Sequence, residues 1–382
     1  MKIVQLVPAM DQGGVERGIV EMNRVLIAAG HDNLVISAGG RLEESILSDG
    51  GRIARVDIKS KNPFTAFSRA KKLREVLESE RPDVVVAHSR VPAWLFVIAN
   101  KKLSLPWITF AHGANSVSAY SKVMTYGDVT VTPSQYIADY LVEHYKIDRS
   151  LLRVIPRAID RNKFDTSELD TEFMAAKRAE WKLDGFRVVM GLGRITQLKG
   201  YDVLIRALSR LQSTHVAAGV DTPDWKLVIV GEAEALRKEY EDELHKLVEE
   251  LGVSNHVVFA GAQSKVAECL SLADIVVSAN YRKPEAFGRS MAEALAMDKP
   301  VVATAFGGAL DIVEDGVNGA LVAPDPKATP QEMAVKFSNA IRFVAHSKFE
   351  RLREKALEKF SFDRMAASSL AVYNEFDKEI AK

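Results

Sequence analysis

The sequence has very little cysteine and no long apolar run. Cys269 is the single cysteine among 382 residues, which excludes an intrachain disulfide and a multi-cysteine zinc site. The longest apolar runs, such as Trp94 to Ala99 and Leu227 to Val230, are far shorter than the roughly 20 residues of a membrane-spanning helix. We therefore expect a soluble chain, and a reducing, cytoplasmic location is consistent with the cysteine usage.

The N-terminus lacks the pattern of a secretory signal peptide. The segment MKIVQLVPAMDQGG has one lysine, an apolar run that ends at Asp11, and no small-residue cleavage pattern. It is predicted to be a strand. With 47% hydrophobic residues over this length, the chain is long enough for two ordinary domains, each with its own core.

Two common phosphate-binding signatures and a metal signature are also missing. Gly191-Leu192-Gly193 lacks the third glycine of a dinucleotide fingerprint, and Lys199-Gly200 is not the Gly-Lys-Ser/Thr of a Walker A loop. These differences argue against an NAD oxidoreductase and a P-loop enzyme. Since the chain also lacks an Asp-x-Asp flanked by strand residues, we predict no metal site and no cofactor.

Charge is balanced overall but not along the chain. Residues 1–165 hold 23 Lys and Arg against 18 Asp and Glu, and the remainder holds 28 against 33. Eight basic residues lie between Arg52 and Arg74 with Asp57 as the sole acidic residue. This segment predicts attraction to an anionic membrane surface, helped by a helix after Pro63 with Phe67, Ala70, Leu73 and Leu77 near one face and Arg69 and Lys71 beside it. The alternative is a core helix with solvated charges.

Apolar runs alternate with helical patterns from the first residue. This βαβ rhythm predicts a parallel sheet covered by helices on both faces. The predicted strands of the first series are 3–7, 33–36, 53–58, 83–87, 107–110, 129–131 and 152–155.

A polar stretch from Arg157 to Asp170 interrupts the rhythm before a second series begins. The predicted strands of the second series are 187–190, 226–230, 256–259, 275–277, 301–303 and 320–322. We therefore predict an α/β fold with two doubly wound, Rossmann-like domains that face each other across a cleft. The predicted bounds are 1–165, 166–360, and 361–382 for a C-terminal helix.

The span from Pro284 to Pro300 combines two carboxylates, a glycine turn and a helix start. Glu285 is predicted in the strand-to-helix loop, and Glu293 about one turn into the helix. Unpaired N–H groups at a helix start suit phosphate oxygens, and carboxylates accept bonds from sugar hydroxyls. A polyhydroxyl, phosphate-bearing ligand is one interpretation, and a surface helix with two solvated glutamates is the other.

Four segments in order resemble the retaining glycosyltransferases of family 4, of the lipopolysaccharide and envelope glycan type. Glu285-Ala-Phe-Gly with Glu293-Ala-Leu-Ala resembles the family's E-x7-E signature, and Gly193-Arg194 with Lys199-Gly200 its diphosphate segment. The other two are Gly13-Gly14-Val15-Glu16 and the late block of Gly307-Gly308 with Asp315 to Gly319. The resemblance implies a GT-B architecture over nearly the whole chain, with the last helix crossing back to the N-terminal domain.

The resemblance also implies roles for the donor-binding residues. Glu293 is expected to hold ribose hydroxyls, Glu285 a hydroxyl of the donor sugar, and the backbone N–H groups of Phe287, Gly288 and Arg289 the sugar and phosphates. Arg194 and Lys199 are expected to stabilise the negative charge that a departing nucleoside diphosphate gains.

In the N-terminal half, His112 matches the family histidine that faces the donor sugar, and Gly13 and Gly14 allow close approach of the backbone to ligand. His88 is a weaker candidate on the acceptor side. One departure is Arg157-Ala158, where the family usually has Asn-Gly, and the family's contacts are not transferred to these two positions. The predicted catalytic residues are thus His112, Arg194, Lys199 and Glu285.

The function predicted from these features is a retaining, metal-independent hexosyltransferase. It would move sugar from a UDP- or GDP-sugar to a glycan or lipid-linked acceptor in envelope polysaccharide or lipopolysaccharide synthesis, at the inner face of the membrane. A front-face route is favoured because no carboxylate is identified as a nucleophile. The alternatives are a nucleotide-sugar epimerase and a non-catalytic nucleotide-sugar-binding protein; nucleic acid is not an expected partner.

Overall fold

The computed structural model describes residues 1–11, 13–218, 224–234, 238–325 and 327–377. The chain forms two compact units, one of residues 1–157 with 363–382 and the other of residues 158–362. The first boundary lies at residue 157, where 165 was predicted, and the last segment of the first unit begins at residue 363, where 361 was predicted. Each unit has its own parallel sheet, and each is described separately below.

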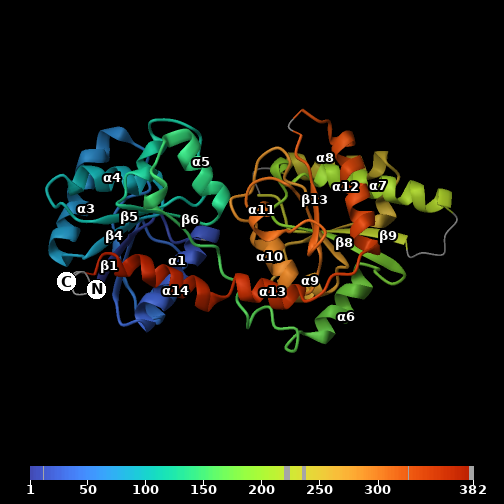
Figure 1. Ribbon diagram of the computed structural model, residues 1–382, viewed down its shortest axis with the longest axis horizontal. Helices are drawn as coiled ribbons and strands as arrows, with labels where there is room; N and C mark the ends of the chain where they lie inside the picture. The colour runs from blue at the N-terminus through green and yellow to red at the C-terminus, as the bar shows by residue number, and fades with distance from the viewer. Residues whose placement is uncertain (12, 219–223, 235–237, 326, 378–382) are drawn as a thin grey trace. The chain divides into compact units, whose positions relative to one another are not determined.

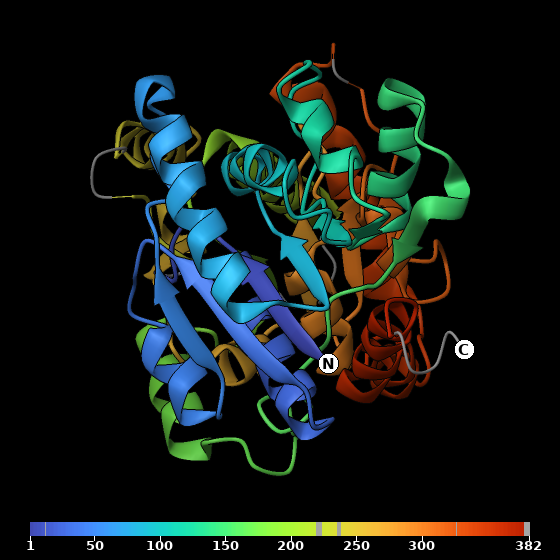
Figure 2. The ribbon, with the colours of Figure 1, turned by 90° about the vertical axis from the view of Figure 1, so that its left-hand side faces the viewer.

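The first unit is built on a seven-stranded parallel sheet with the order β3-β2-β1-β4-β5-β6-β7. Figure 2 shows the blue strands of this unit as arrows that run alongside one another. The strand order reverses between β1 and β4, and ligands of such sheets bind outside the carboxyl ends of the strands at this point. The strands are β1 (Lys2–Leu6), β2 (Asp32–Ser37), β3 (Arg52–Arg55), β4 (Val84–Ala87), β5 (Trp107–Phe110), β6 (Val129–Thr132) and β7 (Leu152–Val154).

Helices cover both faces of this first sheet. In Figure 1, α3, α4 and α5 lie on one side of the strands, and α1 and α14 on the other. Met365, Val372 and Tyr373 of α14 are buried, so the last helix is part of the core of the first unit. The helices are α1 (Gly14–Ala28), α2 (Glu43–Ser48), η1 (Pro63–Thr65), α3 (Ala66–Glu80), α4 (Arg90–Asn100), η2 (Ser121–Thr125), α5 (Gln135–Tyr145), η3 (Arg149–Leu151) and α14 (Phe362–Asn374).

The second unit is built on a six-stranded parallel sheet with the order β10-β9-β8-β11-β12-β13. Its strand order reverses between β8 and β11, which pair directly, with Val276 opposite Met190. The strands are β8 (Phe186–Leu192), β9 (Asp224–Val230), β10 (Val257–Gly261), β11 (Ile275–Ser278), β12 (Val301–Thr304) and β13 (Gly319–Val322).

Two apolar clusters lie on the two faces of the second sheet. One packs α7, α8 and α12 against the strands, and the other packs α9, α10, α11 and α13. The helices of this unit are α6 (Thr171–Glu180), η4 (Gln197–Lys199), α7 (Tyr201–Ala218), α8 (Glu239–Glu250), η5 (Ser254–His256), α9 (Val266–Ser271), α10 (Arg289–Ala296), α11 (Ala309–Ile312), α12 (Pro330–His346) and α13 (Leu352–Lys359).

The fold class predicted from the sequence is confirmed, because both units are doubly wound parallel sheets. All thirteen predicted strands are present, since strands buried on both faces appear in sequence as continuous apolar runs. The ends of the observed strands differ from the predicted ends by a few residues. The run predicted over 53–58 pairs with β2 as far as Arg55, while Val56 and Ile58 are buried beyond the ladder.

For most of the helix after Pro63 the structure shows the alternative, a helix whose apolar face lies in the core. Leu73 and Leu77 of α3 are buried in the core of the first unit. Arg69 does not flank an exposed face either: it is 6% exposed, and its guanidinium donates to the carbonyls of Ser60 and Asn62. Phe67, by contrast, is 76% exposed.

Cys269 lies in α9 and is buried, as expected for a core residue. Burial raises the pKa of its thiol to about 11. Among the helices that the structure describes, none has the length and apolar content to cross a membrane.

Candidate functional site

The loop after β8 carries the predicted diphosphate segment of the second unit. Tyr201, at the start of α7, donates its hydroxyl to the carbonyl of Gly193 at 2.8 Å. Burial raises the pKa of Tyr201, and the negative charge of Glu285 raises it further. The phenol therefore remains protonated and fixes the loop against the helix.

Lys199 and Glu285 form an ion pair between this loop and the loop that follows β11. Lys199 Nζ lies 2.8 Å from Glu285 Oε1, and the two side chains are 21% and 24% exposed. The other oxygen, Glu285 Oε2, is buried and has no hydrogen-bond partner among the described residues. Because β8 and β11 meet at the reversal of strand order, this pair marks the place where ligands bind in such sheets.

Arg194 occupies a more open position in the same loop. Its Nη1 lies 2.6 Å from Glu234 Oε1, and its side chain is 74% exposed. Both predicted cations therefore pair with a carboxylate, Lys199 in a sheltered position and Arg194 at the surface. An anionic ligand would compete with these carboxylates for the two cations.

The span from Pro284 to Pro300 has the predicted loop and helix. Gly288 precedes α10 with φ of 98°, a conformation that favours glycine. Phe287 is buried and packs edge-on against Phe360, with ring centroids 5.5 Å apart. Glu293 lies in α10 and is half-buried.

The late glycine block packs against this span. The amide of Gly308 donates to the carbonyl of Glu285 at 2.7 Å. A side-chain carbon at Gly307 would lie 2.5 Å from that carbonyl oxygen, and one at Gly308 would lie 2.5 Å from Phe287 Cα. The block thus holds the loop of Glu285 through close backbone contact.

In the first unit, Gly13 and Gly14 lie at the start of α1. Gly13 has an extended backbone with φ of 175°, which any residue can adopt. A side-chain carbon at Gly14 would meet no atom within 4 Å in the described part of the chain. The space in front of this loop is therefore open.

His88 and His112 lie at the ends of β4 and β5 and contact each other. His88 Nδ1 lies 3.0 Å from His112 Nε2, and the rings stack at a centroid distance of 5.3 Å. His112 also stacks on Phe110, with centroids 4.3 Å apart. Burial, followed by the positive charge of Arg157, lowers the pKa of His88 to about 3 and that of His112 well below its usual value. Both rings are therefore neutral near pH 7.

A hollow in the first unit opens beside this pair. It is lined by residues at the ends of β1, β4 and β5 and at the start of α1, including Pro8, Glu16, Arg90, His112 and Asn115. The carboxyl ends of three neighbouring strands thus meet at one recess, as expected at a reversal of strand order.

The sequence matches two family models. "Glycosyltransferase Family 4" matches residues 12–163, and "Glycosyl transferases group 1" matches residues 174–353. An uncharacterised glycosyltransferase of Methanocaldococcus jannaschii is 26% identical, with 91% of this chain and 90% of that protein covered. A solved glycosyltransferase from Rickettsia africae has 28% sequence identity and a TM-score of 0.85, with 99% and 98% covered. The chain is a glycosyltransferase with the GT-B fold.

A further relative of this glycosyltransferase is the D-inositol 3-phosphate glycosyltransferase of Stackebrandtia nassauensis. The two are 32% identical over a match that covers 53% of this chain and 44% of that protein. The chain thus matches less than half the length of that relative.

The structure of the glycosyltransferase brings some predicted residues together. Lys199 contacts Glu285, and the loop of Glu285 contacts the glycine block. His112 contacts His88, and both of its ring nitrogens have protein partners. In this structure both ring nitrogens of His112 are therefore engaged within the protein, while the residue lines the hollow.

Sequence reasoning missed Arg157. Its Nη2 lies 2.7 Å from His112 Nδ1, and its guanidinium lies 5.5 Å from the centre of the Phe110 ring. Comparison with the family set this position aside because the usual asparagine is replaced. A second signal was available in the polar residues Gln5 and Asn33, which stand inside otherwise apolar strands.

Proposed function

We propose that the glycosyltransferase moves a hexose, with retention of configuration, from a UDP- or GDP-sugar to a glycan or lipid-linked acceptor. The observation that carries the donor assignment is the Lys199–Glu285 pair, in which Glu285 Oε2 is buried and has no partner among the described residues. A buried carboxylate oxygen is costly unless it is bonded. A hydroxyl of the donor sugar would supply the missing donor.

The remaining donor contacts follow from the positions around this pair. Glu293, half-buried in α10, is proposed to accept from the ribose hydroxyls. The backbone around Phe287, Gly288 and Arg289 leads into the start of α10, where helix N–H groups favour phosphate oxygens. The open space at Gly14 supports close approach of ligand to the loop of Gly13 and Gly14 in the first unit.

The proposed chemistry places the positive charges at the leaving group. As the bond between sugar and phosphate breaks, the diphosphate gains negative charge, and Lys199 and Arg194 would strengthen their contacts with it. Among the described residues no group of His, Cys, Asp and Glu is arranged to hold a metal ion. The proposed reaction is metal-independent, with the two cations stabilising the charge of the leaving diphosphate. In a front-face route, the leaving phosphate takes the proton of the acceptor hydroxyl.

A screen of nucleotide sugars by thermal shift tests the donor assignment. A donor at 100 times its dissociation constant stabilises the folded state by about 2.7 kcal/mol. We expect one UDP- or GDP-sugar to raise the unfolding temperature by several degrees, and Glu285→Ala to abolish the shift. If no nucleotide sugar shifts the transition and none is turned over, the proposal is wrong.

The exposed aromatics of the first unit support an acceptor at an anionic membrane surface. Phe64 is 94% exposed and Phe67 is 76% exposed. Lys61, Lys71 and Lys72, which are exposed, lie within eight residues of them in the sequence. Each lysine near an anionic leaflet is worth about 1 kcal/mol, and the two rings would add apolar burial. This patch of Phe64, Phe67, Lys61, Lys71 and Lys72 would bring the enzyme to a lipid-linked acceptor of envelope glycan synthesis.

Co-sedimentation with vesicles tests the membrane assignment. Binding should be stronger to anionic than to neutral vesicles at low salt, and salt should release it because exposed charges are screened. Phe64→Ser with Phe67→Ser should weaken binding, while Lys101→Glu with Lys102→Glu, at another exposed lysine pair of this unit, should change it less. Equal binding to neutral and anionic vesicles would contradict the assignment.

The name of the inositol 3-phosphate relative indicates a second candidate acceptor, a soluble phosphorylated polyol. Arg90 lines the hollow at the strand ends of the first unit, and its guanidinium would suit a phosphate. Turnover assays with inositol 3-phosphate and with a lipid-linked glycan distinguish the two acceptors. Transfer to the soluble polyol alone would rule out the lipid-linked acceptor.

A further inference from the structure

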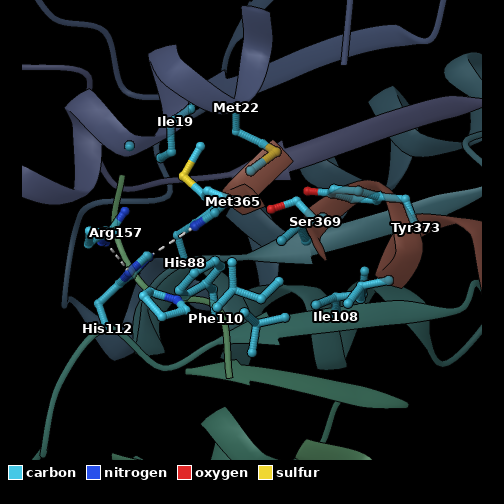
Figure 3. Close-up of a pocket in the computed structure, with 16 residues that line it drawn as sticks. Ile19, Met22, His88, Ile108, Phe110, His112, Arg157, Met365, Ser369 and Tyr373 are labelled. Carbon is cyan, nitrogen blue, oxygen red and sulfur yellow. Dashed lines mark hydrogen bonds between the residues drawn. The ribbon is translucent and has the colours of Figure 1, made fainter. Parts of the chain in front are cut away.

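A chain of hydrogen bonds crosses the first unit from Arg157 to α2. It begins at Arg157 and His112, 2.7 Å apart, and continues to His88 at 3.0 Å. Figure 3 shows these first two bonds as dashed lines. The chain then runs from His88 to Gln5 at 3.0 Å, to Asn33 at 3.0 Å, to Asn23 at 2.7 Å and to the carbonyl of Ile46 at 3.2 Å.

The chemistry at the two ends permits one direction of donation. A guanidinium donates and never accepts, so His112 Nδ1 must accept from Arg157. The proton of His112 then lies on Nε2 and is donated to His88 Nδ1. The carbonyl of Ile46, at the other end, accepts from Asn23.

The links between these ends follow the same direction. His88, having accepted at Nδ1, carries its proton on Nε2 and donates it to Gln5 Oε1. The Gln5 amide donates to Asn33 Oδ1, and the Asn33 amide donates to Asn23 Oδ1. Adding a proton to either ring would place two donors face to face in a chain of which His88, Gln5, Asn33 and Asn23 are buried.

Gly18 makes room for the guanidinium at the start of this chain. A side-chain carbon at Gly18 of α1 would lie 2.0 Å from Arg157 Nη1. Alanine inside a helix is ordinarily more favourable than glycine by about 1 kcal/mol. Gly18 is therefore less favourable for α1 than alanine, but it leaves the space that the Arg157 guanidinium occupies.

We propose that Arg157 is a positioning residue that fixes His112 as the neutral imidazole with its proton on Nε2 and holds the ring flat on Phe110. The role rests on the proposed function, together with the part that the family resemblance implies for His112, which is to face the donor sugar. With both nitrogens bonded inside the protein, His112 acts as a rigid wall of the hollow at the strand ends of the first unit. It is not the base that removes the acceptor proton.

The groups around the two rings agree with this role. The charged side chains that line the adjoining hollow are those of Glu16 and Arg90, whereas Arg157 lines a small cavity of about 30 Å³ on the other side of the pair. Tyr373 lines the same cavity, and Figure 3 shows it beside Ser369. The protein atoms within hydrogen-bond distance of His112 Nδ1 and Nε2 nevertheless belong to Arg157 and His88.

Nitrogen-15 NMR of the histidine rings tests the proposal without reference to activity. The chain has eight histidines, and His112→Asn and His88→Asn identify their signals by loss. In the unaltered protein at pH 7, both rings should show a protonated Nε2 and an unprotonated Nδ1. A proton on Nδ1 of His112, or an imidazolium at either residue, would overturn the proposal.

Variants separate positioning from general stability. Arg157→Met should allow His112 to exchange between tautomers, and Arg157→Lys, which keeps a charged donor, should restore much of the unaltered spectrum. Gly18→Ala should act like Arg157→Met although it leaves the arginine in place. Arg153→Met, at a surface arginine that pairs with Glu375, is the matched control and should leave both rings unchanged.

The kinetic expectation for Arg157→Met is a fall in kcat of about tenfold, with partial rescue by Arg157→Lys. An unchanged His112 spectrum in a folded Arg157→Met protein would overturn the positioning role. If the spectra behave as expected but no nucleotide sugar binds, the proposed function fails and the positioning of His112 stands. The two failures are thus distinguishable.

Discussion

The polar side chains at the candidate site differ between the two units. In the first unit they are mostly neutral and are linked in one chain of hydrogen bonds, whereas in the second unit they are charged and form separate ion pairs. The chain from Arg157 to Asn23 has one cation, the guanidinium of Arg157. The second unit instead has Lys199 with Glu285, Arg194 with Glu234, and Arg282 with Asp202. The chain of the first unit crosses the reversal of strand order between β1 and β4, and the Lys199–Glu285 pair lies at the reversal between β8 and β11.

The difference has a physical consequence for ligand binding. A mostly buried, mostly neutral chain with every link made is costly to break, so it suits a surface that must keep its shape. An ion pair at a loop can exchange one anionic partner for another, so it suits a site that receives a diphosphate. We infer that the first unit supplies rigid shape and the second supplies exchangeable charge.

Lys199→Ala should give the largest effect, because it removes the sheltered cation of the second unit. Loss of one donor that acts in the transition state typically lowers kcat by about 100- to 1,000-fold. We expect that loss in steady-state assays, with the protein still folded. Lys336→Ala, at a lysine 3.9 Å from Asp325, is the control and should keep normal turnover. A near-normal kcat for Lys199→Ala would show that exchangeable charge is not what this loop supplies.

Gly200→Ala and Gly252→Ala form a matched pair that tests how tightly the loop of Lys199 is held. Both glycines have a left-handed backbone, with φ of 67° and 66°. A side-chain carbon at Gly200 would lie 2.2 Å from the carbonyl of Ala279, while one at Gly252 would meet no described atom within 4 Å. Gly252→Ala should cost about 1 kcal/mol of unfolding free energy from backbone strain, and Gly200→Ala about 3 kcal/mol because overpacking adds to it.

Urea unfolding of the two variants measures this difference. Equal losses of stability would mean that the loop can move away from Ala279 without cost. The rigid backbone assigned to the loop of Lys199 would then be wrong.

Much of the fold was predictable, and the reason is visible in particular strands. Trp107 to Phe110 is a short apolar run and forms β5 with the predicted ends. The loops of Lys199 and Glu285 were predicted by family resemblance, but their pairing was not, since the two residues are 86 positions apart. Such a contact depends on the packing of two loops, which periodicity does not report.

Arg157 shows a different limit. The residue was identified as a departure from the family, and no contact was assigned to it. Its partner His112 lies 45 positions away, and the space for it comes from Gly18 on a third segment. A sequence motif describes one segment of the chain. It therefore does not reveal a contact that depends on three segments, here those of Arg157, His112 and Gly18.

The pH dependence of stability tests the neutral chain of the first unit. The pKa of His88 is lowered to about 3, first by burial and then by Arg157, while in the unfolded chain it is about 6.5. Below pH 6.5 the unfolded state therefore binds a proton that the folded state does not. The contribution of the neutral His88 ring to the free energy of unfolding is therefore complete above pH 6.5 and is lost as the pH falls toward 3.

For His88 alone, the loss of unfolding free energy between pH 7 and pH 5 is about 2 kcal/mol, and His112 adds to it in the same direction. Urea titrations at the two pH values measure the loss. His88→Asn should remove most of the contribution of His88, and His346→Asn, at an exposed histidine that bonds the carbonyl of Arg342, should not. A stability that is equal at pH 7 and pH 5 would mean that these rings accept protons in the folded state.

Arg194→Ala should give the smallest of these effects, and it separates stability from turnover. The Arg194–Glu234 pair is exposed, with side chains 74% and 48% accessible, and exposed pairs contribute about 0 to 1 kcal/mol to folding. We therefore expect almost no change in unfolding free energy. Turnover should fall by about tenfold, less than for Lys199→Ala, because solvent screens a cation in this position more strongly.

Glu234→Ala tests whether the carboxylate competes with the ligand for Arg194. The substitution frees Arg194 for the diphosphate, so the KM for the donor should fall or stay constant. A higher KM in Glu234→Ala would show that the carboxylate holds Arg194 in its working position instead of competing with the ligand.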